Sequence, residues 1–415
     1  MPREILVVAD QKAGTVQFLD TVSGAGVGRI EDVVLAEHAG ILPLGGGRCA
    51  FVDDAGGTVI IANPFDTGTP FGGSDPSGHP VQHRISVAIP GEHLACDPAG
   101  RYIAVTTGLG QSWEPWSDLL TVVDLAAGGG PRSRRVRTRA GEPGVVVSET
   151  PDGPRAVLRH REPGGIESLS LERILNEGVH CPQLRGEVMG RISDDGHGDA
   201  YDPATGTMFV ATDRGMERFD VRKQSPEVLE TLPWTAPGRA YFLRFCPRRR
   251  ILVAVLREGG DYPREWDSWR NALWIHDVDS GLTRTAAVGD GLIFRFALTA
   301  TGAAVARVHP DGDDLTVLEL GSLTERGRWV LPDMDQAPRP GREPWDSADR
   351  RAVAASPSSE LVAVTRGGHG ELHLVDTAQP GSPLRTIAAD TPLRDGGHLG
   401  WLSSTQAAPE DTVGR

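Results

Sequence analysis

Val122-Val123-Asp124-Leu125 is a short apolar stretch that ends in a carboxylate and a turn, and this pattern recurs eight times in the 415-residue chain. The acidic or amide residues that end the eight copies are Asp20, Asn63, Asp124, Glu172, Asp220, Asp277, Glu319 and Asp376. Short strands repeated every ~40–50 residues are typical of a β-propeller. The repeat therefore predicts one all-β ring of four-stranded antiparallel blades.

A turn of the type Asp-Pro followed by glycine precedes several of the apolar strands. Residues 97–100 read Asp-Pro-Ala-Gly, and residues 202–206 read Asp-Pro-Ala-Thr-Gly. Proline presets φ in such a turn, and glycine takes the position with positive φ. The expected second strands of the units, such as residues 251–255, are continuously apolar. We expect these strands to be buried between neighbouring blades.

These segments resemble the repeats of YVTN-type and lactonase-like β-propellers. The shared elements are an Asp-Pro turn, a glycine and an apolar strand rich in Val and Ala, as at residues 97–105 and 202–211. The resemblance extends over nearly the whole chain and implies the propeller fold. It implies no particular reaction, because such propellers carry many functions.

The two ends of the chain are expected to share one blade. Residues 4–33 supply three strands without an innermost strand, and residues 398–404 look like the missing strand. Their pairing would remove an open sheet edge and give eight blades. Seven blades is the alternative, because the unit at residues 142–189 is the least regular. We assign residues 1–405 to the propeller domain and predict a disordered tail at residues 406–415.

Composition limits the classes of function. The net charge of −14 argues against nucleic-acid binding. The sequence contains no apolar run near the ~18–20 residues of a membrane span, and its start lacks the apolar core of a secretory signal. The four cysteines form no C-x-x-C pair, which is typical of reduced thiols in a cytoplasmic protein.

Four histidines lie at or just before the expected starts of innermost strands: His38, His93, His197 and His398. Their acidic neighbours in the sequence are Glu37, Glu92, Asp195, Asp199 and Asp395. Ring closure would bring all four imidazoles to one rim of the channel. They could bind a transition metal such as Fe, Cu or Zn, with nearby carboxylates orienting the rings. Alternatively, His93 and His197, with Glu92 and Asp199, could act as acid and base groups.

A structural role for the histidines is the other interpretation. The segment at residues 197–203 matches the His-Gly-x-x-x-Asp-Pro pattern that YVTN-type propellers often carry for structural reasons. On this interpretation the four histidines pack or face a substrate, and no metal is bound.

Three loops that combine tryptophan with acidic residues are expected on the same face as the histidines. Their candidate substrate-binding residues, with a neighbouring tyrosine, are Trp113, Trp116, Trp266, Trp269, Trp345 and Tyr262. These side chains could enclose an apolar or aromatic substrate, or an amine through cation–π contacts. Capping of the blade tops is the alternative role.

The sequence lacks the motifs of several common types of catalytic and binding site. The sequence has no Gly-x-Ser-x-Gly elbow and no phosphate-binding glycine motif in a strand–loop–helix context. Residues 311–314, Asp-Gly-Asp-Asp, are too few for a calcium loop. The arginines at residues 132–139 predict a charged outer strand that blocks strand addition, with a phosphate or partner site as the alternative.

Together these features predict a cytoplasmic small-molecule enzyme with its site at the channel mouth. It could be a metal-dependent lyase, hydrolase or oxygenase. Its partner would be a small-molecule substrate, with no nucleic acid and no membrane, and a protein partner is possible. The alternatives are a non-catalytic scaffold that binds a protein or ligand, and a degenerate enzyme that binds a ligand without turnover.

Overall fold

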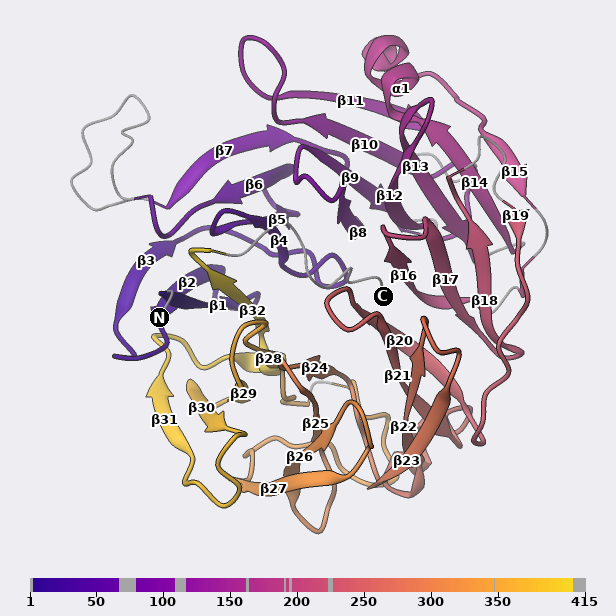
Figure 1. The fold of residues 1–415 in the computed structure, drawn as a ribbon. Helices are drawn as coiled ribbons and strands as arrows, with labels where there is room; N and C mark the ends of the chain where they lie inside the picture. The colour runs from indigo at the N-terminus through magenta and orange to yellow at the C-terminus, as the bar shows by residue number, and fades with distance from the viewer. Residues whose placement is uncertain are drawn as a thin grey trace.

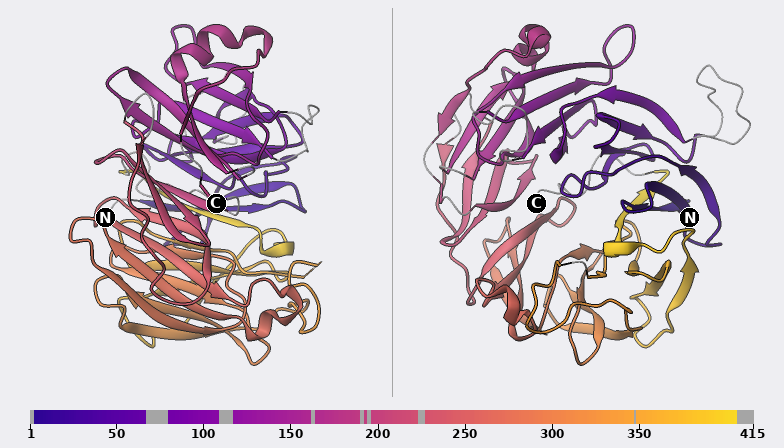
Figure 2. Two further views of the ribbon diagram at one scale, coloured as in Figure 1. Left: turned by 90° about the vertical axis from the view of Figure 1, so that its right-hand side faces the viewer. Right: turned by 180° about the vertical axis from the view of Figure 1, so that it is seen from behind.

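The computed structural model describes residues 3–66, 80–108, 117–161, 164–189, 192–193, 196–222, 227–346 and 348–405. Within these ranges the chain forms eight four-stranded antiparallel sheets around a common axis (Figure 1). The view from behind in Figure 2 shows the same ring of blades. The predicted all-β propeller with eight blades is confirmed, and the seven-blade alternative is wrong.

Each blade runs from an innermost strand at the axis to an outer strand at the rim. The innermost strands are β32 (His398–Ser403), β4 (Leu42–Gly45), β8 (Gly91–Cys96), β12 (Gly144–Thr150), β16 (His197–Asp202), β20 (Arg239–Cys246), β24 (Phe296–Leu298) and β28 (Val353–Ala355). The second strands are β1 (Glu4–Asp10), β5 (Arg48–Asp53), β9 (Tyr102–Thr107), β13 (Gly153–His160), β17 (Thr207–Thr212), β21 (Ile251–Glu258), β25 (Gly302–Arg307) and β29 (Leu361–Arg366).

The third strands are mostly buried, and the outer strands are the more exposed ones. The third strands are β2 (Thr15–Asp20), β6 (Thr58–Ala62), β10 (Leu119–Asp124), β14 (Gly165–Ser170), β18 (Gly215–Asp220), β22 (Arg270–Asp277), β26 (Asp313–Glu319) and β30 (Glu371–Asp376). The outer strands are β3 (Gly26–Ile30), β7 (Val81–Ser86), β11 (Arg132–Arg137), β15 (Glu187–Met189), β19 (Glu227–Val228), β23 (Thr283–Asp290), β27 (Glu325–Leu331) and β31 (Arg385–Ala388). The arginine-rich segment is thus an outer strand, β11, as predicted.

The ring closes through the two ends of the chain. β32 pairs antiparallel with β1, from Glu4 opposite Ser403 to Ala9 opposite His398. β1 is buried along its whole length, which fits a strand enclosed on both sides. The predicted shared blade is therefore confirmed.

The repeated acidic residue has a local role in the turn between the third and outer strands. The Asp124 carboxylate accepts a hydrogen bond from the amide of Ala126 at 3.0 Å, and Asp376 accepts one from Ala378 at 3.1 Å. An aspartate that binds the backbone two residues ahead mimics a backbone turn, so the repeat marks each hairpin. The pattern therefore reflects turn chemistry.

Glu172 is the exception, and its interpretation as a strand end is wrong. β14 ends at Ser170, and Glu172 lies in the first turn of helix α1 (Leu171–Glu177). The Ser170 hydroxyl caps this helix by accepting from the amide of Arg173. Helix α1 and the short helix η1 (Gly178–His180) contact β11 of the preceding blade at the rim (Figure 1).

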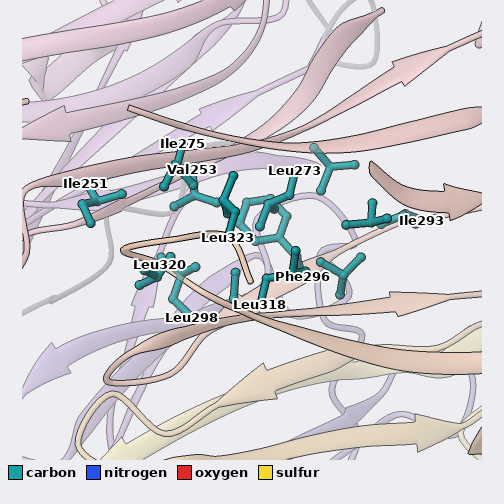
Figure 3. Packing of buried hydrophobic residues seen from close by; sticks show 14 of the residues in the cluster. Ile251, Val253, Leu273, Ile275, Ile293, Phe296, Leu298, Leu318, Leu320 and Leu323 are labelled. Carbon is teal, nitrogen blue, oxygen red and sulfur yellow. The ribbon is translucent and has the colours of Figure 1, made fainter. Parts of the chain in front are cut away.

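The core consists of apolar layers between neighbouring blades. Figure 3 shows the layer between β21 and β22 of one blade and β24 and β26 of the next, where Val253 and Ile275 lie close to Phe296 and Leu318. The first six residues of β21 are all buried, as its continuous apolar sequence predicted. None of the helices in the described part of the chain is long and apolar enough to span a membrane.

Candidate functional site in the axial cavity

A cavity of about 630 Å³ lies on the axis, and all four candidate histidines contribute to its wall. His93 lies within β8, while His197 and His398 begin β16 and β32. His38 lies in the connection that leads to β4. The chain therefore brings together four imidazoles from four blades, as ring closure predicted. Their chemical roles remain predictions.

Among the described residues, Glu92 and Glu37 pair with groups other than the histidines beside them in the sequence. Glu92, the neighbour of His93, instead forms a short hydrogen bond with Nδ1 of His38 on another blade. Glu37, the neighbour of His38, lies 3.4 Å from Arg350. Successive side chains in an extended segment point in opposite directions, so adjacent residues rarely share a partner.

Asp199 and Asp395 also bind cations. Asp199 is buried and accepts from Nε of Arg159 at 3.3 Å, while Asp395 lies 3.2 Å from Lys12. Burial raises the pKa of Asp199 to about 6. Asp199 does not line the cavity, whereas its partner Arg159 does, so the catalytic role of Asp199 stays a prediction. Asp195 lies outside the described residues.

Two of the histidines are held neutral. Burial lowers the pKa of His398 to about 4, and the nearby His38 and Arg350 act in the same direction. Burial also lowers the pKa of His197 to about 4, with smaller contributions from Arg161 and Arg159. At neutral pH both rings therefore offer one nitrogen donor and one acceptor.

The neutral state of His398 predicts a pH-dependent stability that His398→Gln removes. A folded-state pKa below the usual value contributes stability above about pH 6.5, and this stability is lost as pH falls towards 4. Between about pH 7.5 and pH 5 the wild type should lose about 2 kcal/mol more than the variant. Urea unfolding of both proteins at the two pH values measures the difference, and parallel pH profiles would contradict the assignment.

Arginines dominate the charged part of the cavity wall. The wall contains six arginines but four carboxylate residues. The arginines are Arg159, Arg161, Arg257, Arg295, Arg350 and Arg351. Four of them have a carboxylate partner, namely Asp199 at 3.3 Å, Glu142 at 2.8 Å, Glu37 at 3.4 Å and Asp313 at 2.6 Å. Arg257 and Arg295 have no carboxylate partner within 4.0 Å among the described residues.

A smaller chamber of about 90 Å³ adjoins the main cavity. His38, His93, Phe242 and Arg295 line both spaces, so these residues form the boundary between them. The smaller chamber is otherwise mostly apolar, with Leu298, Ala354 and Trp401 among its lining residues. Apart from Arg244, the charged groups and imidazoles of the site therefore lie at the boundary or in the main cavity.

The tryptophans have different positions. Trp345 is 40% exposed and contributes to the cavity wall, where its carbonyl accepts from Nη2 of Arg350 at 3.0 Å. Trp266 and Trp269 are buried with Leu292 and Val308 and do not line the cavity. Their placement is that of the capping alternative, and direct substrate contact is not supported.

The remaining aromatic candidates lie elsewhere. Tyr262 is 65% exposed, outside the cavity wall, and precedes the short helix η2 (Pro263–Ser268). Its predicted contact with a substrate is therefore not supported. Trp113 and Trp116 lie outside the described residues, so their role stays a prediction.

The histidines are not arranged as a metal centre. Within the described residues, no group of three or more His, Cys, Asp or Glu side chains has a geometry that could hold a metal ion. The four imidazoles line one cavity without forming such a group. The predicted Fe, Cu or Zn centre does not fit this arrangement.

The sequence analysis missed the arginines, although the same position in the blade could have revealed them. Arg295 and Arg351 stand just before the innermost strands β24 and β28, as the histidines do before or at theirs. Arg159 and Arg257 lie near the ends of the second strands β13 and β21. Examining all eight strand entrances for any charged residue, and not for histidine alone, would have identified two of them.

Comparisons with known proteins show the fold and no more. The sequence matches no protein-family model, and it matches no curated protein. The structure of apo AztD from Citrobacter koseri has a TM-score of 0.66 and 14% identity, covering 99% of this chain and 100% of that chain. A crystal structure of Citrobacter koseri AztD has a TM-score of 0.64 and 15% identity, covering 97% and 98%.

A third similar structure is dihydro-heme d1 dehydrogenase NirN in complex with DHE. Its TM-score is 0.59 and its identity 12%, and the match covers 97% of this chain and 75% of that chain. These similarities confirm the propeller resemblance. At such low identity they establish no activity.

Proposed function

We propose that the protein is a small-molecule enzyme whose substrate binds in the axial cavity, with His38, Glu92 and His93 as its acid and base groups. The observation that carries this proposal is the His38–Glu92 hydrogen bond beside His93 in the wall of one cavity. A cavity of about 630 Å³ has the size of a typical small-molecule site. These three groups come from two neighbouring blades of a rigid ring, which suits precise positioning.

The His38–Glu92 pair has the properties of a proton-transfer unit. The His38 side chain is 49% exposed, whereas that of Glu92 is 14% exposed. The carboxylate holds Nδ1, so the second nitrogen, Nε2, is the atom that would exchange a proton with a bound substrate. His93 is buried in the same wall and supplies a second imidazole at the boundary between the two chambers.

Replacement of His38 and His93 by glutamine should abolish turnover. Loss of a positioned acid or base group typically reduces a rate by about 10²–10⁴-fold. A metabolite extract is incubated with the wild type and with the His38→Gln/His93→Gln variant, and mass spectrometry follows the compounds consumed. We expect compounds consumed by the wild type to persist with the variant.

A matched variant outside the cavity wall controls for general effects. His373 is buried in β30 between β29 and β31 and does not line the cavity, and its Nδ1 contacts the hydroxyl of Thr386 at 3.1 Å. The His373→Gln variant should retain wild-type turnover. Equal consumption by the wild type and the double variant would exclude these histidines as catalytic residues.

Two alternatives from the sequence make different predictions in this experiment. A scaffold or degenerate enzyme would consume no compound, although it could retain one through purification. A metal-dependent enzyme would carry stoichiometric metal when purified without a histidine tag, which elemental analysis measures. We keep the cytoplasmic location as part of the proposal, with a small-molecule partner, no nucleic acid and no membrane.

A further inference from the structure

The wall of the axial cavity contains two arginines, Arg257 and Arg295, without a carboxylate partner among the described residues, in a protein whose net charge is −14. Six of its wall residues are arginines, and four are carboxylates. Two carboxylates that pair with these arginines, Asp199 and Asp313, are buried outside the wall. A low-dielectric pocket lined by guanidinium groups attracts anions, because solvent screens these charges weakly. The same charges disfavour the amine-bearing substrate that the tryptophan–acid loops suggested.

Arg257 is held in a fixed orientation, and one of its N–H donors has no hydrogen-bond partner. Its guanidinium lies 4.9 Å from the ring centre of Tyr241 and 4.5 Å from that of Trp269. Nη2 donates to the carbonyl of Ile293 at 2.8 Å, whereas Nε has no hydrogen-bond partner. Burial lowers its pKa to about 10, so Arg257 remains protonated at neutral pH. A guanidinium fixed in this way loses little entropy when an anion binds.

The contacts of Arg257 extend to the other unpaired arginine and to a histidine. Ile293, its hydrogen-bond partner, lies in the connection that carries Arg295 into the cavity. The Tyr241 ring also contacts the ring of His197, and the two ring centres lie 5.2 Å apart. Buried Trp269 thus positions Arg257, and this gives a reason for a tryptophan at that loop.

Arg295 lacks a charged partner as well. Nη2 lies 3.4 Å from Nδ1 of His398, a ring that burial keeps neutral. A neutral imidazole satisfies one donor but does not compensate the charge of the guanidinium. Arg295 also lines the boundary between the two chambers together with His38 and His93.

We propose that the axial cavity binds the oxyanion group, a carboxylate or a phosphate, of a small organic molecule, and that Arg257 and Arg295 anchor this group. The inference deepens the proposed function, because it names the class of ligand for the same cavity. Guanidinium groups bind carboxylate and phosphate oxygens in paired, planar contacts. An anion held by Arg295 would place the rest of the molecule beside His38 and His93.

Isothermal titration calorimetry of the full-length protein tests the proposal with three probes. Citrate represents carboxylates, inorganic phosphate represents phosphates, and putrescine represents amines. We expect citrate or phosphate to bind the wild type, and the responding probe identifies which oxyanion the cavity prefers. Putrescine should not bind. Failure of both anions to bind, or binding of putrescine alone, would overturn the proposal.

Variants locate the binding site. Arg295→Met and Arg257→Met should each weaken anion binding about 10- to 100-fold, the usual effect of losing a charge-assisted hydrogen bond. Arg249→Met is the matched control, since Arg249 is exposed in the turn between β20 and β21 and does not line the cavity. It should bind as the wild type does. Equal losses in all three variants would show nonspecific charge effects and refute the site.

Folding and turnover are measured separately, so that each claim can fail alone. Arg257→Met removes stacking contacts and could unfold the blade; Arg257→Lys keeps the charge and should bind more weakly than the wild type while unfolding cooperatively. Turnover by a wild type that binds neither citrate nor phosphate would refute the anchor and retain the enzyme. Anion binding without any turnover would retain the anchor and refute the enzyme.

Discussion

Deletion of residues 397–415 is expected to prevent the protein from reaching a stable folded state. The deletion removes β32, whose six residues pair with β1 and bury Trp401 and Leu402. Loss of one buried tryptophan and one buried leucine costs about 5–10 kcal/mol. Because a typical domain is stable by ~5–15 kcal/mol, little would remain. Soluble yield and cooperative thermal unfolding measure the effect.

Deletion of residues 406–415 is the matched control. These residues lie outside the described ranges, and the sequence predicts that they form a disordered tail. The shorter deletion should leave the unfolding midpoint and the yield at wild-type values. A folded, cooperative protein after the longer deletion would show that the ring does not depend on β32.

Arg351→Met is expected to cause the largest loss of stability among single substitutions in the cavity wall. Nε of Arg351 donates to Asp313 at 2.6 Å, and Nη1 donates to the carbonyl of Thr365 at 3.2 Å. Both partners are buried, and burial raises the pKa of Asp313 and lowers that of Arg351. Removing one member of a buried pair leaves the other uncompensated and costs about 3–5 kcal/mol. Urea unfolding at neutral pH measures this loss.

A second substitution separates the charge from the packing. Adding Asp313→Asn to Arg351→Met replaces the unpaired carboxylate with a neutral amide of the same shape. The double variant should recover part of the stability lost by the single variant, because a neutral amide is less costly to bury than a carboxylate. If the double variant is less stable than Arg351→Met, the loss comes from packing and not from the unpaired charge.

Local chemistry made most of the fold predictable. Asp124 and Asp376 bind the backbone of their own turns, and such short-range contacts repeat with the blades. The prediction that Glu172 ends a strand was wrong, because a sequence pattern of the same appearance also starts a helix. Ser170 caps α1, while Leu171, Ile174 and Leu175 are its buried residues. Their helical spacing was present in the sequence and outweighed the repeat.

The site was only partly predictable, because its contacts join different blades. Histidines at strand starts could be placed on one cavity from topology alone. The pairing of His38 with Glu92, however, depends on the direction of each side chain across two blades. The stacking of Arg257 between Tyr241 and Trp269 likewise depends on packing that no local pattern encodes. The sequence therefore predicted which region of the fold holds the candidate groups, but it did not predict which side chains contact one another.

The register of the closing strands has a mechanical consequence. Glu4, at the start of β1, lies opposite Ser403, at the end of β32. A force that pulls the two chain ends apart would therefore act on one end of the paired strands and open their hydrogen bonds one after another. Strands loaded in this way resist less than strands sheared along their length. The pairing of β1 with β32, which closes the ring, would therefore be the first to open under tension.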